Sequence, residues 1–266
     1  MKPGIATHLL TTALLCGASA LAAHAQGDAL ALTTPEVFKA ADGEILNIRI
    51  YMPPAPPADK KLPVVLFLHG AGERGSDNAL QLKHGIDSLI RYGKDANDPA
   101  ILLIPQCPAG QTWVDIPWTT KAHTMKEKPA QPMRLTLELL RAKLAALPVD
   151  PARVYITGVS MGGYGTCDAV QREPRLFAAA LPICGGADTN LVSAIRHVPI
   201  WTFHGDKDTA VPVSRSRDIA AALGACGGNI RYREYPDAGH DVWTRTYNDA
   251  DVLKWFFSQR KKPDET

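Results

Sequence analysis

Short apolar runs alternate with helix-like segments along most of this chain. The run Val64-Val65-Leu66-Phe67-Leu68 is apolar at every position, which is typical of a strand buried on both faces. Further strands are expected at 100–104, 154–157, 178–183, 200–203 and 230–235, and helices at 79–92, 133–147, 161–171, 214–223 and 249–259. This alternation predicts the α/β class: a mostly parallel sheet with helices on both faces.

The two ends of the sequence suggest how the chain is divided. Residues 1–25 have the form of a secretory signal peptide, with Lys2, the apolar run 9–15 and a cleavage site at Ala23-His24-Ala25, before Gln26. A membrane anchor is the weaker alternative, because the apolar run is too short to span a bilayer. We therefore expect a single domain, 26–266, in the periplasm or secreted, with no stable membrane insertion after cleavage.

The N-terminal part of this domain should add an edge hairpin to the sheet, with strands at 37–40 and 44–51. The proline-rich stretch 53–57 after it predicts a turn or a short surface linker. Charge is nearly balanced, with 29 Lys and Arg against 27 Asp and Glu. Nothing in this balance suggests a nucleic-acid partner, which usually needs a clustered excess of Lys and Arg.

Four cysteines remain after the predicted cleavage: Cys107, Cys167, Cys184 and Cys226. An even number permits disulfides in an oxidising compartment, but the sequence does not choose among the pairings, and four free, buried thiols are the alternative. No CxxC pair is present, so no metal site is expected.

The strongest chemical signal is Gly158-Val159-Ser160-Met161-Gly162, between an expected strand and an expected helix. This is the context of a nucleophile elbow, in which a tight turn exposes the serine at the start of a helix. A plain glycine-rich turn is the alternative. We predict that Ser160 is a nucleophile, which at neutral pH requires a base and an acid that orients the base.

Two carboxylates follow the expected strand 200–203, in the segment His204-Gly205-Asp206-Lys207-Asp208. We predict that Asp208 is the acid of the triad and that Asp206 caps the turn. For either residue the alternative is a solvated Asx turn.

His240 is the predicted base, because it lies on a loop past a strand end, after the acid and before the closing helix. No other histidine of the domain meets all three conditions, so structural or surface roles are expected for the remaining five: His69, His84, His123, His197 and His204. His69 and His204 each precede a glycine at a strand end, where we expect them to fix turns.

Acyl transfer also needs two N–H donors where negative charge develops. Met161, directly after the nucleophile, is predicted to supply one of them. The second is predicted from Ala71, in the small-residue turn that follows the strand 64–68. Glu73 and Arg74 of that turn are expected to hold the loop rather than to react.

A long irregular segment, 107–132, follows a strand end and holds Trp113, Trp118 and His123. We predict that these residues, with Trp243, line the substrate pocket, because aromatic side chains offer apolar area to a ligand. The alternative, that the tryptophans pin the loop to the body of the protein, has equal weight.

Together these motifs resemble the α/β-hydrolase esterases. The resemblance rests on the segments Leu68–Gly75, Pro105–Pro108, Val154–Gly165, Pro182–Gly186 and Gly239–His240. It is strongest to bacterial proteins labelled predicted peptidases or phospholipase/carboxylesterase-like, near the dienelactone hydrolases and the feruloyl and polyhydroxybutyrate esterases. It implies an α/β-hydrolase fold with a minimal lid or none, no cofactor, and a small-molecule or polymer-derived ester as substrate.

Cysteine positions refine this resemblance. Dienelactone hydrolases carry Cys in the elbow, where this chain has Ser160. Cys107 and Cys184 match the family pattern and are not expected to act as nucleophiles. Cys167 stands where relatives are expected to have Trp, and a Cys167–Cys226 bridge is a conjecture that would explain both residues.

Three functions are compatible with these patterns. The favoured one is a serine esterase that works through an acyl-enzyme. A serine peptidase could use the same triad, although no segment for extended peptide subsites is evident. A non-catalytic binding protein on the hydrolase scaffold is the third, and loss of a triad residue would be its mark.

Overall fold

The computed structural model describes residues 29–54 and 60–261. Its centre is an eight-stranded sheet in the order β1-β2-β4-β3-β5-β6-β7-β8. The strands are β1 (Thr34–Lys39), β2 (Ile45–Tyr51), β3 (Leu62–Leu68), β4 (Ile101–Gln106), β5 (Val149–Val159), β6 (Ala179–Ile183), β7 (Ile200–Gly205) and β8 (Ile230–Tyr235). β2 is antiparallel to both β1 and β4, and all other neighbouring strands are parallel. This is the α/β-hydrolase arrangement, and it confirms the predicted fold class and the N-terminal edge hairpin.

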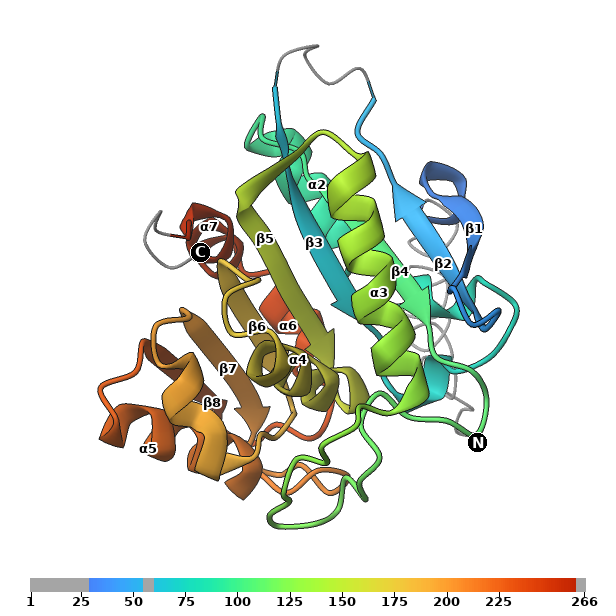
Figure 1. Ribbon diagram of the computed structural model, residues 1–266. Coiled ribbons are helices and arrows are strands. Elements are labelled where there is room, and N and C mark those ends of the chain that lie inside the picture. Colours follow the sequence, from blue (N-terminus) through green and yellow to red (C-terminus); the bar gives the residue numbers. More distant parts are fainter. Residues whose placement is uncertain (1–28, 55–59, 262–266) are drawn as a thin grey trace, which may run out of the picture.

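Helices cover both faces of the sheet (Figure 1). They are α2 (Ile86–Asp95), α3 (Gln131–Ala146), α4 (Met161–Arg172), α5 (Ser214–Ala225), α6 (Trp243–Tyr247) and α7 (Ala250–Ser258), with three short 3-10 turns, η1 (Ala71–Glu73), η2 (Leu80–Leu82) and η3 (Thr189–Ile195). Apolar residues of α3, α4 and α5 belong to one core, and those of α2 and α7 belong to the other.

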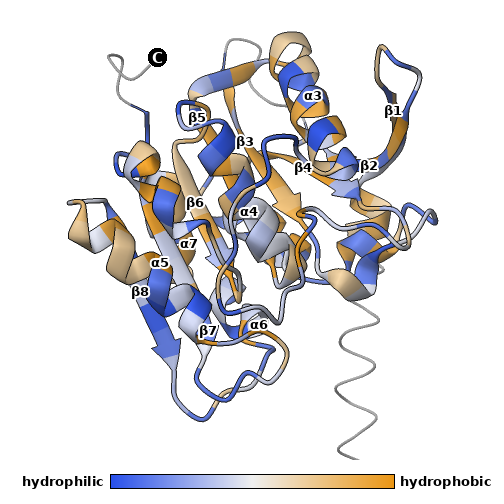
Figure 2. Ribbon diagram, turned by 60° about the horizontal axis from the view of Figure 1, so that its bottom comes forward, coloured by the Kyte–Doolittle hydropathy of each residue, from blue (hydrophilic) through white to orange (hydrophobic). Residues whose placement is uncertain are grey.

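β3 shows why the sheet needs both layers. Val64, Leu66 and Leu68 lie in the core under α3 and α4, whereas Val65 and Phe67 lie in the core under α2 and α7. All five side chains are fully buried, because successive residues of a strand point to opposite faces. Figure 2 shows the same organisation, with hydrophobic central strands and a hydrophilic β8 at the edge.

The expected helix 79–92 is wrong as a single element. The structure places the short turn η2 in its first part and starts α2 only at Ile86. Gly85 separates the two with φ of +75°, and a Cβ there would lie 2.6 Å from the Tyr247 ring. A left-handed residue ends helical geometry, and the periodicity of the sequence does not reveal it.

The predictions for the signal peptide, the proline-rich stretch and the cysteines have different outcomes. The signal peptide at 1–25 and most of the proline-rich stretch lie outside the described residues. All four cysteines of the domain are free thiols, which corrects the conjectured Cys167–Cys226 bridge. Among the described residues, no helix has the length and apolar character to cross a membrane.

Candidate active site

Ser160 occupies a strained turn between β5 and α4. Its φ is +55° and its ψ is −117°, a combination that is rare for a residue with a side chain and is concentrated at functional sites. Glycines make the turn possible on both sides: a Cβ on Gly158 would lie 2.4 Å from the Gly162 carbonyl oxygen, and one on Gly162 only 1.9 Å from that of Leu68. The serine is thereby held at the C-terminal edge of the sheet, half-buried.

Neighbouring strands bring the other two predicted residues to this edge. β7 and β8 are parallel and end opposite each other, at Gly205 and Tyr235. The loops that follow are in close contact, because a Cβ on Gly205 would lie 2.2 Å from the Gly239 carbonyl oxygen. Asp208 and His240 are carried by these two loops.

The three side chains form one hydrogen-bonded chain. His240 Nε2 lies 2.8 Å from Ser160 Oγ, and His240 Nδ1 lies 2.6 Å from Asp208 Oδ2. An imidazole that donates from Nδ1 to the carboxylate leaves Nε2 free to accept the serine proton. The sequence therefore placed the three predicted residues correctly relative to one another, over separations of 80 and 32 residues.

Asp208 is buried and fully hydrogen-bonded. Its side chain is 0% exposed, and its Oδ1 accepts the backbone N–H groups of Ala210 and Val211 at 2.8 and 2.9 Å. Burial by itself raises the pKa of this carboxyl, but the hydrogen bonds from His204, His240 and Val211 outweigh it and hold the pKa well below the usual range. Asp208 is therefore ionised at neutral pH.

The alternative acid, Asp206, has a different position. Its carboxylate accepts the backbone N–H of Ala238 at 3.3 Å, and its own N–H donates to the Tyr235 carbonyl at 3.1 Å. Asp206 thus ties the two loops together, which agrees with the turn-capping role expected for it.

The predicted oxyanion donors come from adjacent loops. β3 and β5 pair in parallel with Leu68 opposite Gly158, so the turn after β3 lies beside the elbow. Met161 is the first residue of α4, and the first N–H groups of a helix have no partner within the helix. Ala71 is the first residue of η1 on the neighbouring turn. The close approach of Gly162 to Leu68 joins these two segments directly.

His69 sets the orientation of this turn. Its Nε2 accepts the backbone N–H of Cys107 at 2.9 Å, so the proton is on Nδ1, which donates to the Gly70 carbonyl at 2.7 Å. In a trans peptide the N–H points away from the C=O, so fixing the Gly70 carbonyl also fixes the direction of the Ala71 N–H. Burial lowers the pKa of His69 to about 4, which keeps the ring neutral and agrees with the turn-fixing role expected for it.

Glu73 and Arg74 hold the same turn, as expected. Glu73 is buried, and its carboxylate lies 3.4 Å from His84 Nε2. Arg74 Nε donates to the Ala71 carbonyl at 2.8 Å. The turn is further fixed by Gln106, whose amide donates to the Glu73 carbonyl at 3.2 Å. Gln106 was not predicted, although its position at the end of β4 beside β3 could have suggested it.

The four predicted pocket residues do not form one group. Trp113 is 0% exposed and its indole N–H donates to the His69 carbonyl at 2.9 Å. It is a core residue that pins the long loop, which corrects the pocket prediction for Trp113. Trp118 and His123 are half-buried on that loop, and Trp243 is half-buried with its ring edge-on to His240, 5.1 Å between centroids.

Arg215 anchors the middle of the long loop. This buried arginine donates to the Lys121 carbonyl at 2.8 Å and to Nδ1 of His123, and it lies over the Tyr164 ring. Burial and the neighbouring Arg215 lower the pKa of His123 to about 4. His123 is therefore neutral at physiological pH. Sequence patterns gave no sign of this anchor, because α5 and the loop meet only in the folded chain.

The buried cysteines near the site are not nucleophiles, and the group of potential metal ligands beside the triad is occupied by hydrogen bonds within the protein. Burial raises the pKa of Cys107 to about 12 and that of Cys184 well above its usual range, so neither is a thiolate nucleophile. Among the described residues, one group of three potential ligand side chains was found: Cys184, His204 and Asp208. His204 and Asp208 are engaged in hydrogen bonds within the protein, so this group does not fit a metal centre.

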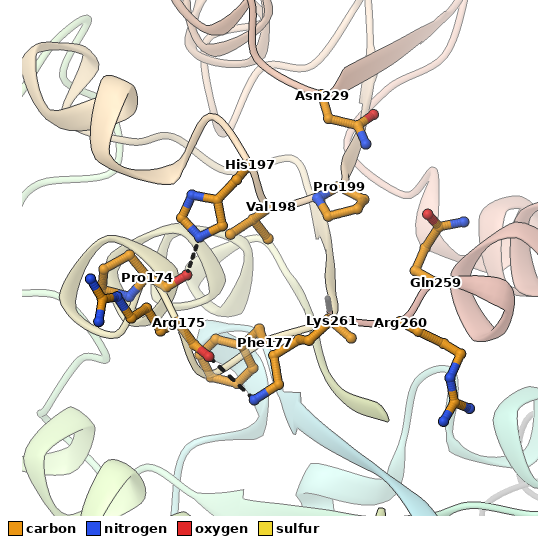
Figure 3. Close-up of a pocket in the computed structure, with 11 residues that line it drawn as sticks. Pro174, Arg175, Phe177, His197, Val198, Pro199, Asn229, Gln259, Arg260 and Lys261 are labelled. Atoms are coloured by element: carbon orange, nitrogen blue, oxygen red, sulfur yellow. Dashed lines mark hydrogen bonds between the residues drawn. The ribbon is translucent and has the colours of Figure 1, made fainter. Parts of the chain in front are cut away.

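A separate cavity lies at the opposite edge of the sheet (Figure 3). It has a volume of about 170 Å³. Its lining includes His197, shortly before β7, and Lys261, after α7. His197 Nε2 donates to the Pro174 carbonyl at 2.8 Å. None of the predicted site residues lines this cavity.

Comparison with known proteins places this geometry in a family. Residues 55–253 match the phospholipase/carboxylesterase model of the α/β-hydrolases. The chain belongs to the phospholipase/carboxylesterase family. Esters are the substrates typical of this family. The predicted resemblance to esterases is thereby confirmed.

Individual relatives agree with this family assignment. A probable carboxylesterase of rice (Oryza sativa subsp. japonica) is 24% identical over 67% of this chain and 81% of its own length. A second rice relative, a probable inactive carboxylesterase, is 22% identical over 70% of this chain and 82% of its own length. The solved structure of a thermostable esterase is 36% identical with a TM-score of 0.81; the match covers 87% of this chain and 64% of that one.

Proposed function

We propose that this member of the phospholipase/carboxylesterase family hydrolyses carboxylic esters through an acyl-enzyme on Ser160. The single observation that carries the proposal is the unbroken hydrogen-bonded chain from Ser160 through His240 to Asp208. Because the family also includes a relative described as inactive, this geometry is stronger support than membership alone.

In the proposed reaction Ser160 Oγ attacks the ester carbonyl carbon while its proton passes to His240 Nε2. The carbonyl oxygen becomes an oxyanion, which accepts hydrogen bonds from the N–H groups of Met161 and Ala71. The imidazolium, paired with ionised Asp208, then gives its proton to the departing alcohol. Water enters, loses a proton to His240 and attacks the acyl carbon, and the carboxylic acid leaves as Ser160 recovers its proton.

The substrate side of the site is proposed to lie around Trp118, His123 and Trp243. These residues are half-buried, and Trp243 contacts the ring of His240 directly. Residues at this position would contact the leaving group or the acyl chain and so select among esters.

A substrate panel tests the proposal. It comprises p-nitrophenyl esters of graded chain length, feruloyl esters, acetylated sugars and aminoacyl amides, each assayed with wild-type protein and with Ser160→Ala. We expect turnover of at least one ester class, lost in the variant. Turnover of amides alone would indicate a peptidase. Turnover of nothing, by folded protein, would contradict the proposal.

We also propose that the protein works outside the cytoplasm, on the basis of the charged and apolar pattern of residues 1–25. Expression of the full chain in a bacterial host, followed by mass spectrometry of the periplasmic and secreted fractions, tests this. We expect a mature N-terminus at Gln26. Uncleaved protein confined to the cytoplasm would contradict the proposal.

A further inference from the structure

The Asp208 carboxylate lies between two serine–histidine pairs. On one side are His240 and Ser160, described above. On the other side His204 Nε2 lies 3.1 Å from the same oxygen, Oδ2, and His204 Nδ1 lies 2.7 Å from Ser216 Oγ. This second pair has no part in the proposed reaction, yet it contacts the same carboxylate oxygen.

The hydrogen-bond network fixes the proton on His204. Nε2 faces two oxygen acceptors, Asp208 Oδ2 and the Val211 carbonyl, each at 3.1 Å. An unprotonated nitrogen there would set its lone pair against both oxygens, so Nε2 carries the proton. Nδ1 then accepts a hydrogen bond from the Ser216 hydroxyl, 2.7 Å away. The Ser216 hydroxyl thus complements the tautomer whose Nε2–H faces Asp208 and Val211.

Burial excludes a direct reaction by this pair. His204 and Ser216 are both 0% exposed, whereas the side chain of His240 is 26% exposed. His204 stands on β7 and Ser216 on α5, so both are carried by regular elements of the core. His204 can reach neither a substrate nor solvent, and any effect on the reaction must pass through Asp208.

The position of the carboxylate depends on both of its oxygens. Oδ1 is held by backbone N–H groups of its own loop. Oδ2 accepts from His240 Nδ1, on a surface loop, and lies 3.1 Å from Nε2 of His204, a side chain in the core. Without His204, Oδ2 would depend more heavily on the His240 imidazole, which must itself be held in place.

We propose that His204, held at Nδ1 by Ser216, is a positioning residue that fixes Asp208 Oδ2 beneath His240 and thereby keeps His240 Nε2 directed at Ser160. The proposal rests on the proposed function, since it assigns no chemistry to His204 beyond that triad. Its effect should appear in kcat, because the contact orients a proton carrier and does not touch the substrate.

The first test compares His204→Leu with His204→Gln. We expect His204→Leu to lower kcat by about 10- to 100-fold with KM within about 2-fold, the size of a lost hydrogen bond to a charged group. His204→Gln retains an N–H donor and should recover most of this loss. Ser216→Ala should cost less, about 2- to 10-fold, because it leaves His204 present.

A matched control is His197→Leu, the same substitution at the opposite edge of the sheet. His197 also donates a ring N–H to an oxygen acceptor, but it is remote from the triad. We expect kcat to be unchanged in this variant, provided that its circular dichroism and thermal unfolding show a folded protein. A drop equal to that of His204→Leu would assign the loss to general destabilisation and overturn the proposal.

The decisive test repeats His204→Leu in an Asp208→Ala background. If His204 acts through Asp208, its substitution should cost less than about 2-fold once the carboxylate is gone. An equal cost in both backgrounds would overturn the proposal, and so would unchanged kcat in folded His204→Leu. If His204→Leu does not fold, Ser216→Ala, with its expected cost of about 2- to 10-fold, enters the same cycle with the same criterion. Failure of the proposed function would differ, since wild-type protein would then hydrolyse no ester.

Discussion

Two serine–histidine pairs lie at the C-terminal edge of the sheet, and both contact the Asp208 carboxylate. His240 and Ser160 form the surface layer, and His204 and Ser216 form the sealed layer. His240 is 26% exposed and reaches Ser160, whereas His204 is fully buried and reaches Ser216. The histidine–serine distances are similar, 2.8 and 2.7 Å, whereas Asp208 Oδ2 lies 2.6 Å from His240 and 3.1 Å from His204. Access separates them: only the surface pair can pass a proton to a substrate, and the sealed pair can only hold the carboxylate in place.

The largest expected difference is between the two serines. Ser160→Ala should lower kcat for esters on the order of 10⁵- to 10⁶-fold, because no nucleophile remains. Ser216→Ala removes one neutral hydrogen bond in the sealed layer and should cost no more than about 10-fold. Steady-state kinetics on the same p-nitrophenyl ester measure both. A loss of kcat of similar size in Ser160→Ala and Ser216→Ala would show that the two serines do not differ in role.

The next largest effect concerns the two aspartates of the loop after β7. Asp208→Asn should lower kcat on the order of 10⁴-fold, as loss of the orienting carboxylate does in other serine hydrolases. Asp206→Asn should leave kcat within about 2-fold and reduce the free energy of unfolding by about 1 kcal/mol, through its bond to Ala238. Kinetics and urea unfolding of both variants test this. The reverse result would make Asp206 the acid.

Trp113 and Trp118 extend the comparison to the long loop. Trp113→Ala should reduce the free energy of unfolding by about 3–5 kcal/mol, because the side chain is fully buried. Trp118→Ala should mainly raise KM for bulky esters. Denaturant unfolding and kinetics on the ester panel separate the two effects. Unchanged KM and kcat for Trp118→Ala on every ester would remove it from the pocket.

The smallest effect is a pH dependence of stability from the buried His69, at the turn after β3. The pKa of His69 is lowered by burial to about 4, against about 6.5 in an unfolded chain. Below pH 6.5 the unfolded state binds a proton that the folded state does not, so stability falls as pH decreases toward 4. His69 should account for a loss of about 2 kcal/mol between pH 7 and pH 5.

Urea unfolding of wild-type protein and of His69→Asn at both pH values measures this contribution. We expect a flatter pH dependence in the variant, whatever its stability at pH 7. The same slope in both proteins would show that His69 is not held neutral in the folded state.

The triad could be predicted from the sequence because its geometry follows from topology. Parallel strands end at one edge, so residues that follow β5, β7 and β8 meet there even when they are far apart in the chain. The elbow glycines and the order Ser160, Asp208, His240 are therefore sufficient to predict that these three side chains meet, as they do in the structure.

The buried contacts of His204 and Trp113 could not be predicted in the same way. The contact between His204 and Ser216 depends on how α5 packs on β7, and the burial of Trp113 depends on space left by Gly165, where a Cβ would lie 2.8 Å from the tryptophan. Patterns along the chain do not record such contacts. The one local signal is the spacing of four residues between His204 and Asp208, whereas the glycine after His204 predicts only a turn-fixing role for it.

The most direct test of the account is covalent labelling with a fluorophosphonate, followed by peptide mapping. The account predicts one modified residue, Ser160, in wild-type protein. Labelling should be lost in Ser160→Ala and strongly slowed in His240→Ala, while Ser216→Ala should still be labelled at Ser160. Folded wild-type protein that is not labelled, or is labelled at a residue other than Ser160, would contradict the central claim that this serine is an activated nucleophile.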